Sequence, residues 1–228
     1  MIAQNFDYSK PASLSDALAQ LADGTAKPLA GGMSLIPMMK LRLAAPEKVV
    51  DLSGVAELTN ITEAGQTIKI GAMATHHTIE ISALLRAKCP LLAETAAHIG
   101  DVQVRNMGTI GGASAHADPA ADYPAALLAL EAQFAIVSKS GARAVSAADF
   151  FVDAMTTALA CSASSRRRIS ASKAASLRNQ ASCDLPRAAQ DIERTLHAHG
   201  ATHRRAHTLQ FARDRLSSRV TPVLRGPH

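Results

Sequence analysis

Residues 104–130 read VRNMGTIGGASAHADPAADYPAALLAL, and the glycine pair within this stretch decides how the chain is interpreted. An earlier glycine pair occurs in residues 30–34, which read AGGMS directly after a short apolar run. Because glycine permits φ > 0 and has no Cβ, successive backbone N–H groups can converge around an anion. We therefore expect that the loops at 30–34 and 109–113 can each bind phosphate oxygens, and that together they suit a pyrophosphate.

Ten residues make up these two loops. They are Ala30, Gly31, Gly32, Met33 and Ser34 in the first loop, and Thr109, Ile110, Gly111, Gly112 and Ala113 in the second. The hydroxyls of Ser34 and Thr109 add donors, and a helix starting near Ser34 would direct its positive end at the same charge. Taken singly, a glycine pair more often makes only a tight turn. The chain contains neither G-x-G-x-x-G nor G-K-S/T, which disfavours a Rossmann site and a P-loop.

The hydrophobic pattern of residues 1–160 predicts short helices and strands that alternate. Helices are expected after an N-cap at Ser13, over residues 34–46 with an interruption at Pro37, and over residues 78–87 and 90–99. Strands are expected at residues 27–32 and 48–54, in a hairpin over 57–73, and in a helix-to-strand passage over 127–137 that ends at a turn of residues 138–141. This order predicts an α+β fold without a repeat.

The composition of the 228-residue chain excludes several classes of protein. Hydrophobic residues make up 47%, but no apolar run reaches the roughly 18 residues of a membrane span. The first residues lack the features of a secretory signal, so we expect a cytoplasmic protein. The three cysteines, Cys89, Cys161 and Cys183, form no C-x-x-C pair, which argues against a disulfide framework and places any iron–sulfur cluster in a partner.

The net charge of the chain changes from negative to positive near residue 160. Residues 1–160 carry eleven Lys or Arg against fifteen Asp or Glu, whereas residues 161–228 carry thirteen against four. Apolar periodicity nearly vanishes after residue 160, where Ser, Ala and Arg dominate. We therefore expect 161–228 to be an atypical basic Ser/Ala/Arg-rich tail that is either disordered or out-of-frame.

Three stretches together closely resemble the FAD-binding medium subunit of the molybdenum hydroxylases, the group that includes carbon monoxide dehydrogenase and xanthine dehydrogenase. They are residues 30–55 (AGGMSLIPMMKLRLAAPEKVVDLSGV), 70–80 (IGAMATHHTIE) and 104–130. The opening residues 6–21 (FDYSKPASLSDALAQL) extend the resemblance, which covers roughly residues 1–159. The motifs are long, ordered and correctly spaced, so the resemblance is specific.

The resemblance implies an α+β FAD-binding fold of the vanillyl-alcohol-oxidase (PCMH) type, with an N-terminal subdomain at 1–54 and a middle subdomain at 55–160. In that family both glycine loops cradle the pyrophosphate, which by matching motif assigns the ten loop residues as cofactor contacts. Asp122 matches an aspartate that hydrogen-bonds the FAD sugar or ribityl hydroxyls, a role that an ionised carboxylate fills as an acceptor. The family often has Asn where this chain has Ala113. The family's C-terminal domain is missing here or replaced by the tail.

The implied function is electron transfer within a larger enzyme. In the family, a large subunit with the molybdenum cofactor oxidises the substrate, and a small subunit with two-iron iron–sulfur clusters relays single electrons to the FAD of the medium subunit. The resemblance therefore implies an FAD-dependent oxidoreductase subunit in a hetero-oligomer with those two partners. No catalytic acid or base is expected on this chain.

The sequence also suggests other kinds of site, but less strongly. His76, His77 and His116, together with Asp118 and Asp122, suggest metal ligands, but no further Cys or acidic residues stand at ligand spacing, so we expect hydrogen-bonding histidines and a turn role for Asp118. Arg105 suits either phosphate or a salt bridge. Cys89 before Pro90 is expected to be a packed thiol.

The basic tail and the cofactor fold each leave other interpretations open. The tail carries an i,i+4 histidine pattern at His199, His203 and His207, which also suits a metal or nucleic acid. A basic nucleic-acid-binding protein would use the Arg-rich tail, and a stand-alone flavin oxidase would reduce its flavin directly with substrate. We favour an out-of-frame translation after about residue 160 that replaces the C-terminal domain and leaves the flavin poorly shielded.

Overall fold

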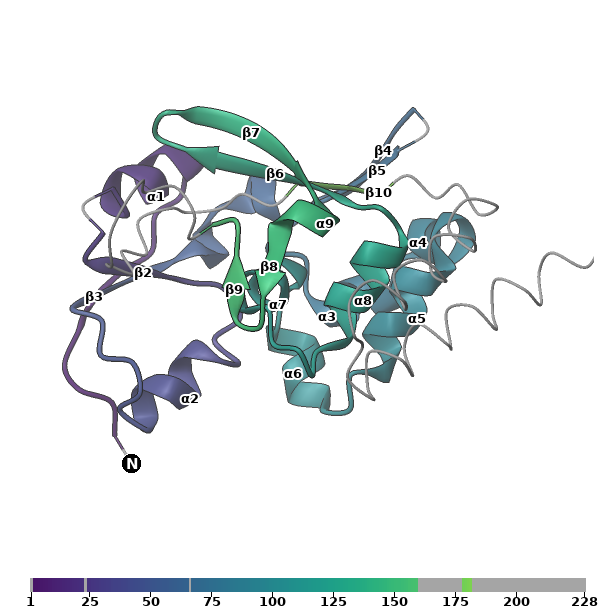
Figure 1. Cartoon of the computed structure of the whole chain (residues 1–228). Coiled ribbons are helices and arrows are strands. Elements are labelled where there is room, and N and C mark those ends of the chain that lie inside the picture. The colour runs from purple at the N-terminus through teal and green to yellow at the C-terminus, as the bar shows by residue number, and fades with distance from the viewer. Residues whose placement is uncertain (1, 23, 66, 160–177, 182–228) are drawn as a thin grey trace, which may run out of the picture.

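The computed structural model describes residues 2–22, 24–65 and 67–159, together with the backbone of residues 178–181. In this part of the chain the strands form sheets of three, five and two strands (Figure 1). Helices and strands are mixed, in agreement with the expected α+β class. None of the helices described is long and apolar enough to cross a membrane.

The first sheet is parallel, with β3 (Lys48–Asp51) between β1 (Asp7–Ser9) and β2 (Ala26–Leu29). Helix α1 (Leu14–Gln20) connects β1 to β2 and confirms the helix predicted after Ser13. The Ser13 hydroxyl accepts a hydrogen bond from the Asp16 N–H at 3.1 Å, which caps the helix as its residue type predicts. The loop 30–34 follows β2 directly.

Helix α2 (Leu35–Lys40) runs through Pro37, so the predicted interruption at that proline is wrong. Pro37 is the third residue of the helix, where the backbone N–H would have no partner within the helix in any case. Proline therefore costs no intrahelical hydrogen bond at this position. The helix ends at Lys40, well before the predicted limit at residue 46.

The second sheet is antiparallel, in the order β4 (Ile61–Ala64), β5 (Thr67–Ile70), β10 (Arg178–Ala181), β6 (Gln133–Ser138) and β7 (Gly141–Ser146). The β4–β5 pair confirms the hairpin predicted over 57–73, and β6 turns into β7 at the predicted position. Strand β10 lies between these two hairpins, with Asn179 opposite both Ile70 and Phe134. The composition of the tail does not predict this strand.

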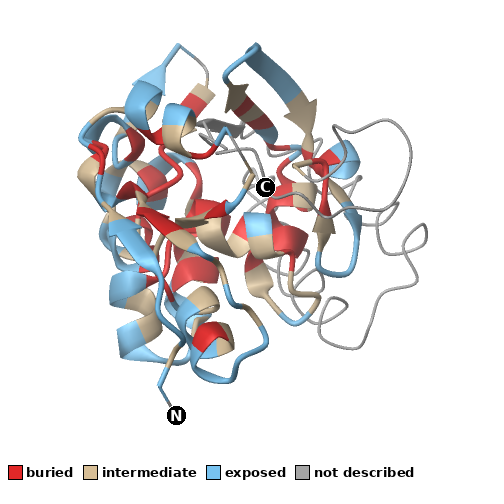
Figure 2. Ribbon diagram, turned by 90° about the vertical axis from the view of Figure 1, so that its left-hand side faces the viewer, coloured by how far each residue is buried: buried red, intermediate tan, exposed pale blue. Residues whose placement is uncertain are grey.

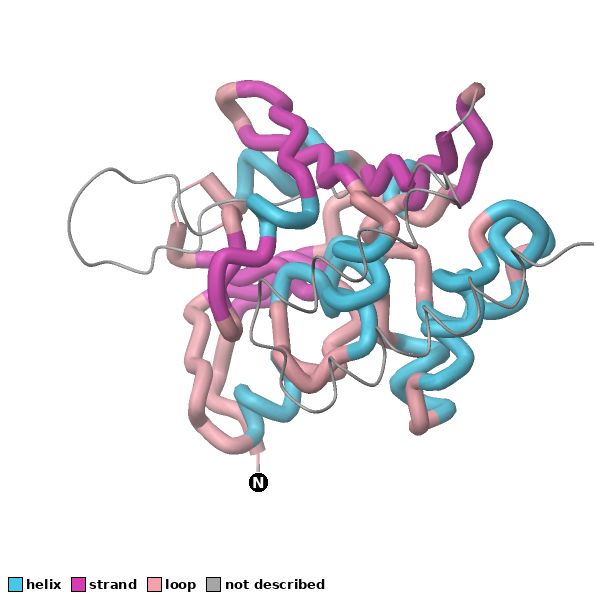
Figure 3. Tube along the Cα trace, turned by 45° about the vertical axis from the view of Figure 1, so that its right-hand side comes forward, coloured by secondary structure: helices cyan, strands magenta, loops and turns pink. Residues whose placement is uncertain are grey.

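Helices lie on one side of the five-stranded sheet (Figure 3). The chain between β5 and β6 forms α3 (His76–Ile81), α4 (Ala83–Lys88), α5 (Pro90–His98), α6 (Val102–Met107), α7 (Ile110–His116) and α8 (Asp122–Ala129), and α5 and α8 share the larger core with β5 and β6. Helix α9 (Ala147–Phe150) precedes the short hairpin of β8 (Phe151–Asp153) and β9 (Thr156–Thr157). The predicted helix 90–99 is confirmed, but the helix predicted over 78–87 is two helices. Ser82 separates them in an extended conformation, and its hydroxyl caps α4.

The segment 72–74 joins two hydrophobic cores. Ala72 and Ala74 belong to the larger core, in which Ile70, Phe134 and the α5 and α8 helices meet, whereas Met73 belongs to the smaller core of the N-terminal sheet. Buried residues accordingly line the inward faces of strands and helices throughout the described part (Figure 2). Residues 72–74 therefore run between the two cores. The carbonyls of Ala72 and Ala74 accept hydrogen bonds from the second glycine loop.

Candidate cofactor site

The first glycine loop presents free backbone donors. Within the described part of the chain, no acceptor engages the N–H groups of Gly31, Gly32, Met33 or Ser34. Gly32 has φ of +74°, the left-handed conformation that favours glycine and turns the loop from β2 toward α2. Four consecutive unpaired N–H groups form the kind of concave donor array that binds phosphate oxygens.

In the second glycine loop, four of the five backbone N–H groups, those of residues 110–113, already have acceptors within the described chain. Ile110 N–H donates to the Ala74 carbonyl at 3.0 Å, and Gly111 N–H donates to the Ala72 carbonyl at 2.9 Å. Gly112 N–H donates to the Thr109 hydroxyl at 3.1 Å, which makes Thr109 the N-cap of α7. The expectation of a second anion-binding nest is therefore wrong for these backbone N–H groups. In the second loop, glycine is needed because a Cβ on Gly111 would lie 2.5 Å from the Ala72 carbonyl oxygen.

The two loops nevertheless lie against each other. A Cβ on Gly31 would collide with the Met107 carbonyl oxygen, and a Cβ on Gly112 would lie 3.4 Å from the Ala30 Cβ. Glycine at position 31 thus lets the first loop approach the backbone that leads into the second. Loops that are nearly 80 residues apart in sequence form one surface.

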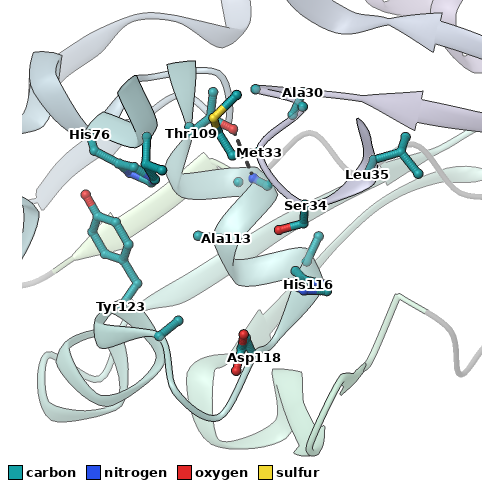
Figure 4. A pocket seen from close by; sticks show the side chains of 18 of the residues that line it. Ala30, Met33, Ser34, Leu35, His76, Thr109, Ala113, His116, Asp118 and Tyr123 are labelled. Carbon is teal, nitrogen blue, oxygen red and sulfur yellow. Dashed lines mark hydrogen bonds between the residues drawn. The ribbon is translucent and has the colours of Figure 1, made fainter. Parts of the chain in front are cut away.

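A cavity of about 470 Å³ opens beside this surface (Figure 4). Ten of the eleven residues predicted to contact a cofactor line it: Ala30, Gly31, Gly32, Met33, Ser34, Thr109, Gly111, Gly112, Ala113 and Asp122. The remaining one, Ile110, is fully buried in the larger core and does not reach the cavity wall. The sequence therefore predicted most of this wall, although its hydrogen bonding differs between the two loops.

The end of α7 and the start of α8 also line the cavity. His116, Asp118 and Asp122 line it, with Asp122 in the first turn of α8. The Asp118 carboxylate accepts the Ala120 N–H at 2.8 Å, which confirms the predicted turn role. Ala117, which has φ of +50°, ends α7, and its carbonyl accepts the Met155 N–H at 2.9 Å. The β8–β9 hairpin is thereby attached to this wall.

His76 and Tyr123 line the same cavity, and the sequence pattern predicted neither of them as a cofactor contact. His76 was expected to be a hydrogen-bonding surface or loop histidine, but its side chain is 4% exposed and its Nδ1 atom has no partner among the described residues. Burial lowers the His76 pKa from 6.5 to about 4, so the imidazole is neutral at pH 7. His76 shares the buried face of α3 with Ile79, three residues further on, and this spacing is the signal that could have revealed its burial.

Arg105 and Cys89 have structural roles. Arg105 lies outside the cavity wall, where its Nε atom is 3.4 Å from a Glu80 carboxylate oxygen and its guanidinium donates to the Ile99 carbonyl at 2.5 Å. Of the two roles expected for Arg105, phosphate binding or a salt bridge, the structure shows the salt bridge. The Cys89 thiol is buried in the larger core, as predicted. Among the described residues, no group of three or more His, Cys, Asp or Glu side chains is placed to hold a metal ion.

The predictions for the tail lie outside the described residues, apart from the backbone of β10. They include the metal or nucleic-acid role of the tail histidines and arginines and the out-of-frame translation. The subdomain limits at 54 and 160 and the cofactor contacts of individual residues stay predictions.

Comparison with known proteins identifies the family. Residues 4–163 match the model of the FAD binding domain in molybdopterin dehydrogenase. The carbon monoxide dehydrogenase medium chain of Afipia carboxidovorans is 47% identical over 161 residues, which cover 70% of this chain and 56% of that relative. The glyceraldehyde dehydrogenase medium chain of Sulfolobus acidocaldarius is 43% identical over 158 residues, covering 69% and 56%. The chain thus spans about half the length of these curated relatives.

Solved structures show the same fold. Carbon monoxide dehydrogenase from Hydrogenophaga pseudoflava superposes with a TM-score of 0.72 at 40% identity, covering 80% of this chain and 61% of that one. Quinoline 2-oxidoreductase from Pseudomonas putida 86 gives a TM-score of 0.70 at 28% identity and covers 96% of both chains. The family match spans more than half of the sequence, and the solved structures share the fold of this chain. The chain therefore belongs to the family of FAD-binding domains in molybdopterin dehydrogenases.

Proposed function

We propose that this chain is the FAD-binding electron-transfer subunit of a molybdenum hydroxylase, which passes electrons from the iron–sulfur clusters of a partner subunit through flavin to an acceptor. The observation that supports it most directly is the row of unpaired N–H groups at residues 31–34 beside a cavity. The cytoplasmic location expected from the sequence is part of this proposal.

The cavity fits the diphosphate of FAD through dipoles. Among the described residues, neither Lys nor Arg lines the cavity, so binding of an anion there depends on backbone N–H groups and hydroxyls. The N–H groups of Gly31–Ser34 have no competing acceptor within the described chain, and the Ser34 hydroxyl makes no helix-cap bond. Such an array is complementary to phosphate oxygens and needs no formal positive charge.

The acidic wall suits the sugar part of the cofactor. Asp122 and Asp118 line the same cavity as the first loop, and carboxylates accept hydrogen bonds from hydroxyl groups. We assign Asp122 to a ribose or ribityl hydroxyl. Two carboxylates placed next to the phosphates would repel them, so the sugar is the part of FAD that this wall favours.

FAD, when bound, supplies a carrier that accepts electrons singly and releases them in pairs. The residues of this chain bind and orient that carrier. The assignment needs no proton transfer by a side chain of the cavity. The oxidised substrate would be bound by the molybdenum-containing large subunit, so this chain does not determine substrate specificity.

Titration of the full chain with FAD tests the proposal, with flavin fluorescence as the readout. We expect saturable binding, and we expect FAD to slow hydrogen exchange of the amides at residues 31–34. Gly32→Ala should weaken binding about ten-fold, because a left-handed φ costs a residue with a Cβ about 1–2 kcal/mol and distorts the donor row. A chain that does not bind FAD would contradict the proposal.

Gly65→Ala is the matched control. Gly65 also has a positive φ, of +64°, but it lies in the β4–β5 turn, and a Cβ there would meet no atom within 4 Å. The control should therefore lose the stability that a positive φ costs a residue with a Cβ, without the 2.6 Å contact with Ile36 Cδ1 that a Cβ on Gly32 would make, and should retain wild-type FAD affinity. Equal loss of affinity in both variants would show that Gly32 acts through general stability.

A further inference from the structure

Two residues with a strained backbone are bonded to each other beside the cavity. In the described part of the chain, four residues other than glycine have a positive φ, and Ala117 and Met155 are two of them, at +50° and +54°. This left-handed conformation brings the Cβ close to the following carbonyl oxygen, so it persists only where the surrounding structure holds it. The Met155 N–H donates to the Ala117 carbonyl at 2.9 Å. One hydrogen bond thus joins the two strained positions.

The conformation of Ala117 determines where two cavity side chains lie. Ala117 is the C-cap of α7, and its left-handed backbone ends the helix. His116 before it and Asp118 after it both line the cavity, and Figure 4 shows both side chains at this end of α7. A right-handed Ala117 would redirect the chain from residue 118 onward, so Asp118 would leave its place in the wall. Cavity shape therefore depends on this one backbone conformation.

The β8–β9 hairpin that carries Met155 is fixed at its base. Phe151 packs edge-on against Phe150, with ring centroids 5.1 Å apart. The Ala158 N–H donates to the Phe150 carbonyl at 2.8 Å, and the Arg143 guanidinium donates to the Ala158 carbonyl at 2.7 Å. These contacts attach both ends of the hairpin to the large sheet and its core. The hairpin is therefore a fixed support and not a movable flap.

Met155 is an unusual residue for its position in the turn of this hairpin. Tight turns place Gly or Asn where φ is positive, because these residues tolerate that conformation. Met155 lacks this tolerance, and its side chain is 53% exposed, so packing does not compensate for the strain. What the conformation provides is the hydrogen bond from the Met155 N–H to the end of α7.

We propose that Met155 is a positioning residue of the cavity, whose N–H holds the Ala117 carbonyl and so keeps the α7–α8 turn in the conformation that presents His116 and Asp118. Met155 does not itself line the cavity, so it acts through the turn. This inference rests on the proposed function, because it assigns a support to the wall beside which FAD would bind.

Hydrogen exchange of the ligand-free, unsubstituted chain is the first test. The Ala117 N–H bonds the Ala113 carbonyl within α7, whereas the Met155 N–H lies in an exposed turn. If the hairpin holds the end of α7, the two amides open together, and the Met155 amide should exchange as slowly as that of Ala117. This measurement needs neither a variant nor FAD.

Met155→Pro removes the N–H and cannot adopt a positive φ, so it breaks the bond to Ala117. In the ligand-free chain, amide exchange at residues 117–121 should become about ten-fold faster. FAD should bind about five- to ten-fold more weakly, because the turn loses the support that offsets its strain. Met155→Gly keeps the N–H and should retain wild-type exchange at 117–121 and wild-type FAD affinity.

Ala154→Pro is the matched control. Ala154 is exposed in the same turn, and its N–H donates to the Asp153 carboxylate at 2.7 Å. Proline is common in turns at the position before a left-handed residue. The control should therefore keep slow exchange at 117–121 and wild-type FAD affinity.

Ala117→Gly tests whether the effect passes through the left-handed turn. Glycine adopts this conformation without strain, so the turn depends less on the hairpin. Adding Ala117→Gly to Met155→Pro should therefore return most of the lost FAD affinity. A hairpin that matters only for general stability would show no such rescue, because the substitution restores none of its contacts.

The possible failures are distinguishable. Fast exchange of the Met155 amide in the unsubstituted chain overturns the positioning role, as does equal FAD affinity in Met155→Pro and Ala154→Pro. A loss of affinity that Ala117→Gly does not reverse, or that Met155→Gly shares, also overturns it. All of these leave the proposed function intact when the unsubstituted chain binds FAD. Absence of FAD binding by that chain overturns the proposed function, and the exchange data still test the support of the turn.

Discussion

The loops at residues 30–34 and 109–113 both contain a glycine pair and line the same cavity, but they use glycine for different purposes. In the first loop, Gly32 adopts a left-handed conformation and the backbone donors stay free. In the second, Gly111 and Gly112 are helical, and their N–H groups are bonded to Ala72 and Thr109. The first loop is built to present donors, whereas the second is built to pack closely. Similar sequence thus leaves backbone donors unpaired in the described part of the first loop and allows close packing of two backbone segments in the second.

The largest expected effect would come from Gly111→Ala. Its Cβ would lie 2.5 Å from the Ala72 carbonyl oxygen and 2.7 Å from the Ala72 Cβ, so backbone must move. We expect a loss of about 3 kcal/mol or more in unfolding free energy, measured by urea denaturation. Gly100→Ala, where a Cβ would meet no atom within 4 Å, is the control for stability. If Gly111→Ala is as stable as Gly100→Ala, the second loop does not depend on close packing.

Acid should affect the second loop next most strongly, through His76. In the unfolded chain His76 is protonated near pH 6.5, but the buried imidazole resists protonation until about pH 4. The unfolded state therefore binds more protons between these values, so the stability contribution is complete above pH 6.5 and is lost as the pH falls to about 4. The expected loss is up to about 3 kcal/mol.

Urea denaturation at pH 7 and pH 4.5 measures this effect. His76→Leu should flatten the pH dependence, whereas His77→Gln, at the exposed neighbouring position, should retain it. Because His76 N–H bonds the Gly108 carbonyl, acid should speed hydrogen exchange at α7 before it affects the first loop. An unchanged pH profile in His76→Leu would place the acid sensitivity elsewhere.

The smallest expected effects are those of the two loop hydroxyls, and they should have opposite signatures. Thr109→Val removes the cap acceptor of Gly112 N–H and should cost about 1 kcal/mol of stability with little change in FAD affinity. Ser34→Ala removes a hydroxyl that makes no cap bond, so stability should hold while FAD affinity falls about two- to five-fold. Thermal melts and FAD titrations of both variants provide the comparison. A similar pattern in both would remove the distinction between the loops.

Local signals in the sequence predicted the elements that local interactions determine. Ser13 and the apolar spacing after it predicted α1, and alternation around the Ala-Gly turn predicted the β4–β5 hairpin. Pro37 misled the prediction because its effect depends on its position in the helix, and the helix start at Leu35 is not marked by a capping side chain.

The site was predicted to the extent that it depends on residue type. The sequence predicted that both glycine loops contact one pyrophosphate, and in the structure both loops line one cavity. It could not show that the Ile110 and Gly111 N–H groups are already bonded, because their acceptors, the Ala74 and Ala72 carbonyls, lie almost 40 residues earlier in the chain. His76 and Tyr123 escaped notice for the same reason: burial of each depends on helices that pack together only in the folded chain.

Strand β10 has a consequence for how the two hairpins of the large sheet hold together. Residues 178–181 are placed between β5 and β6, so the hairpins meet only through this insertion from much later in the chain. A product ending near residue 160 would leave two facing rows of open main-chain groups, which are ready templates for aggregation. A strand in the middle of the sheet needs backbone N–H and C=O groups that are free to bond on both of its edges. Any short stretch without proline can supply them.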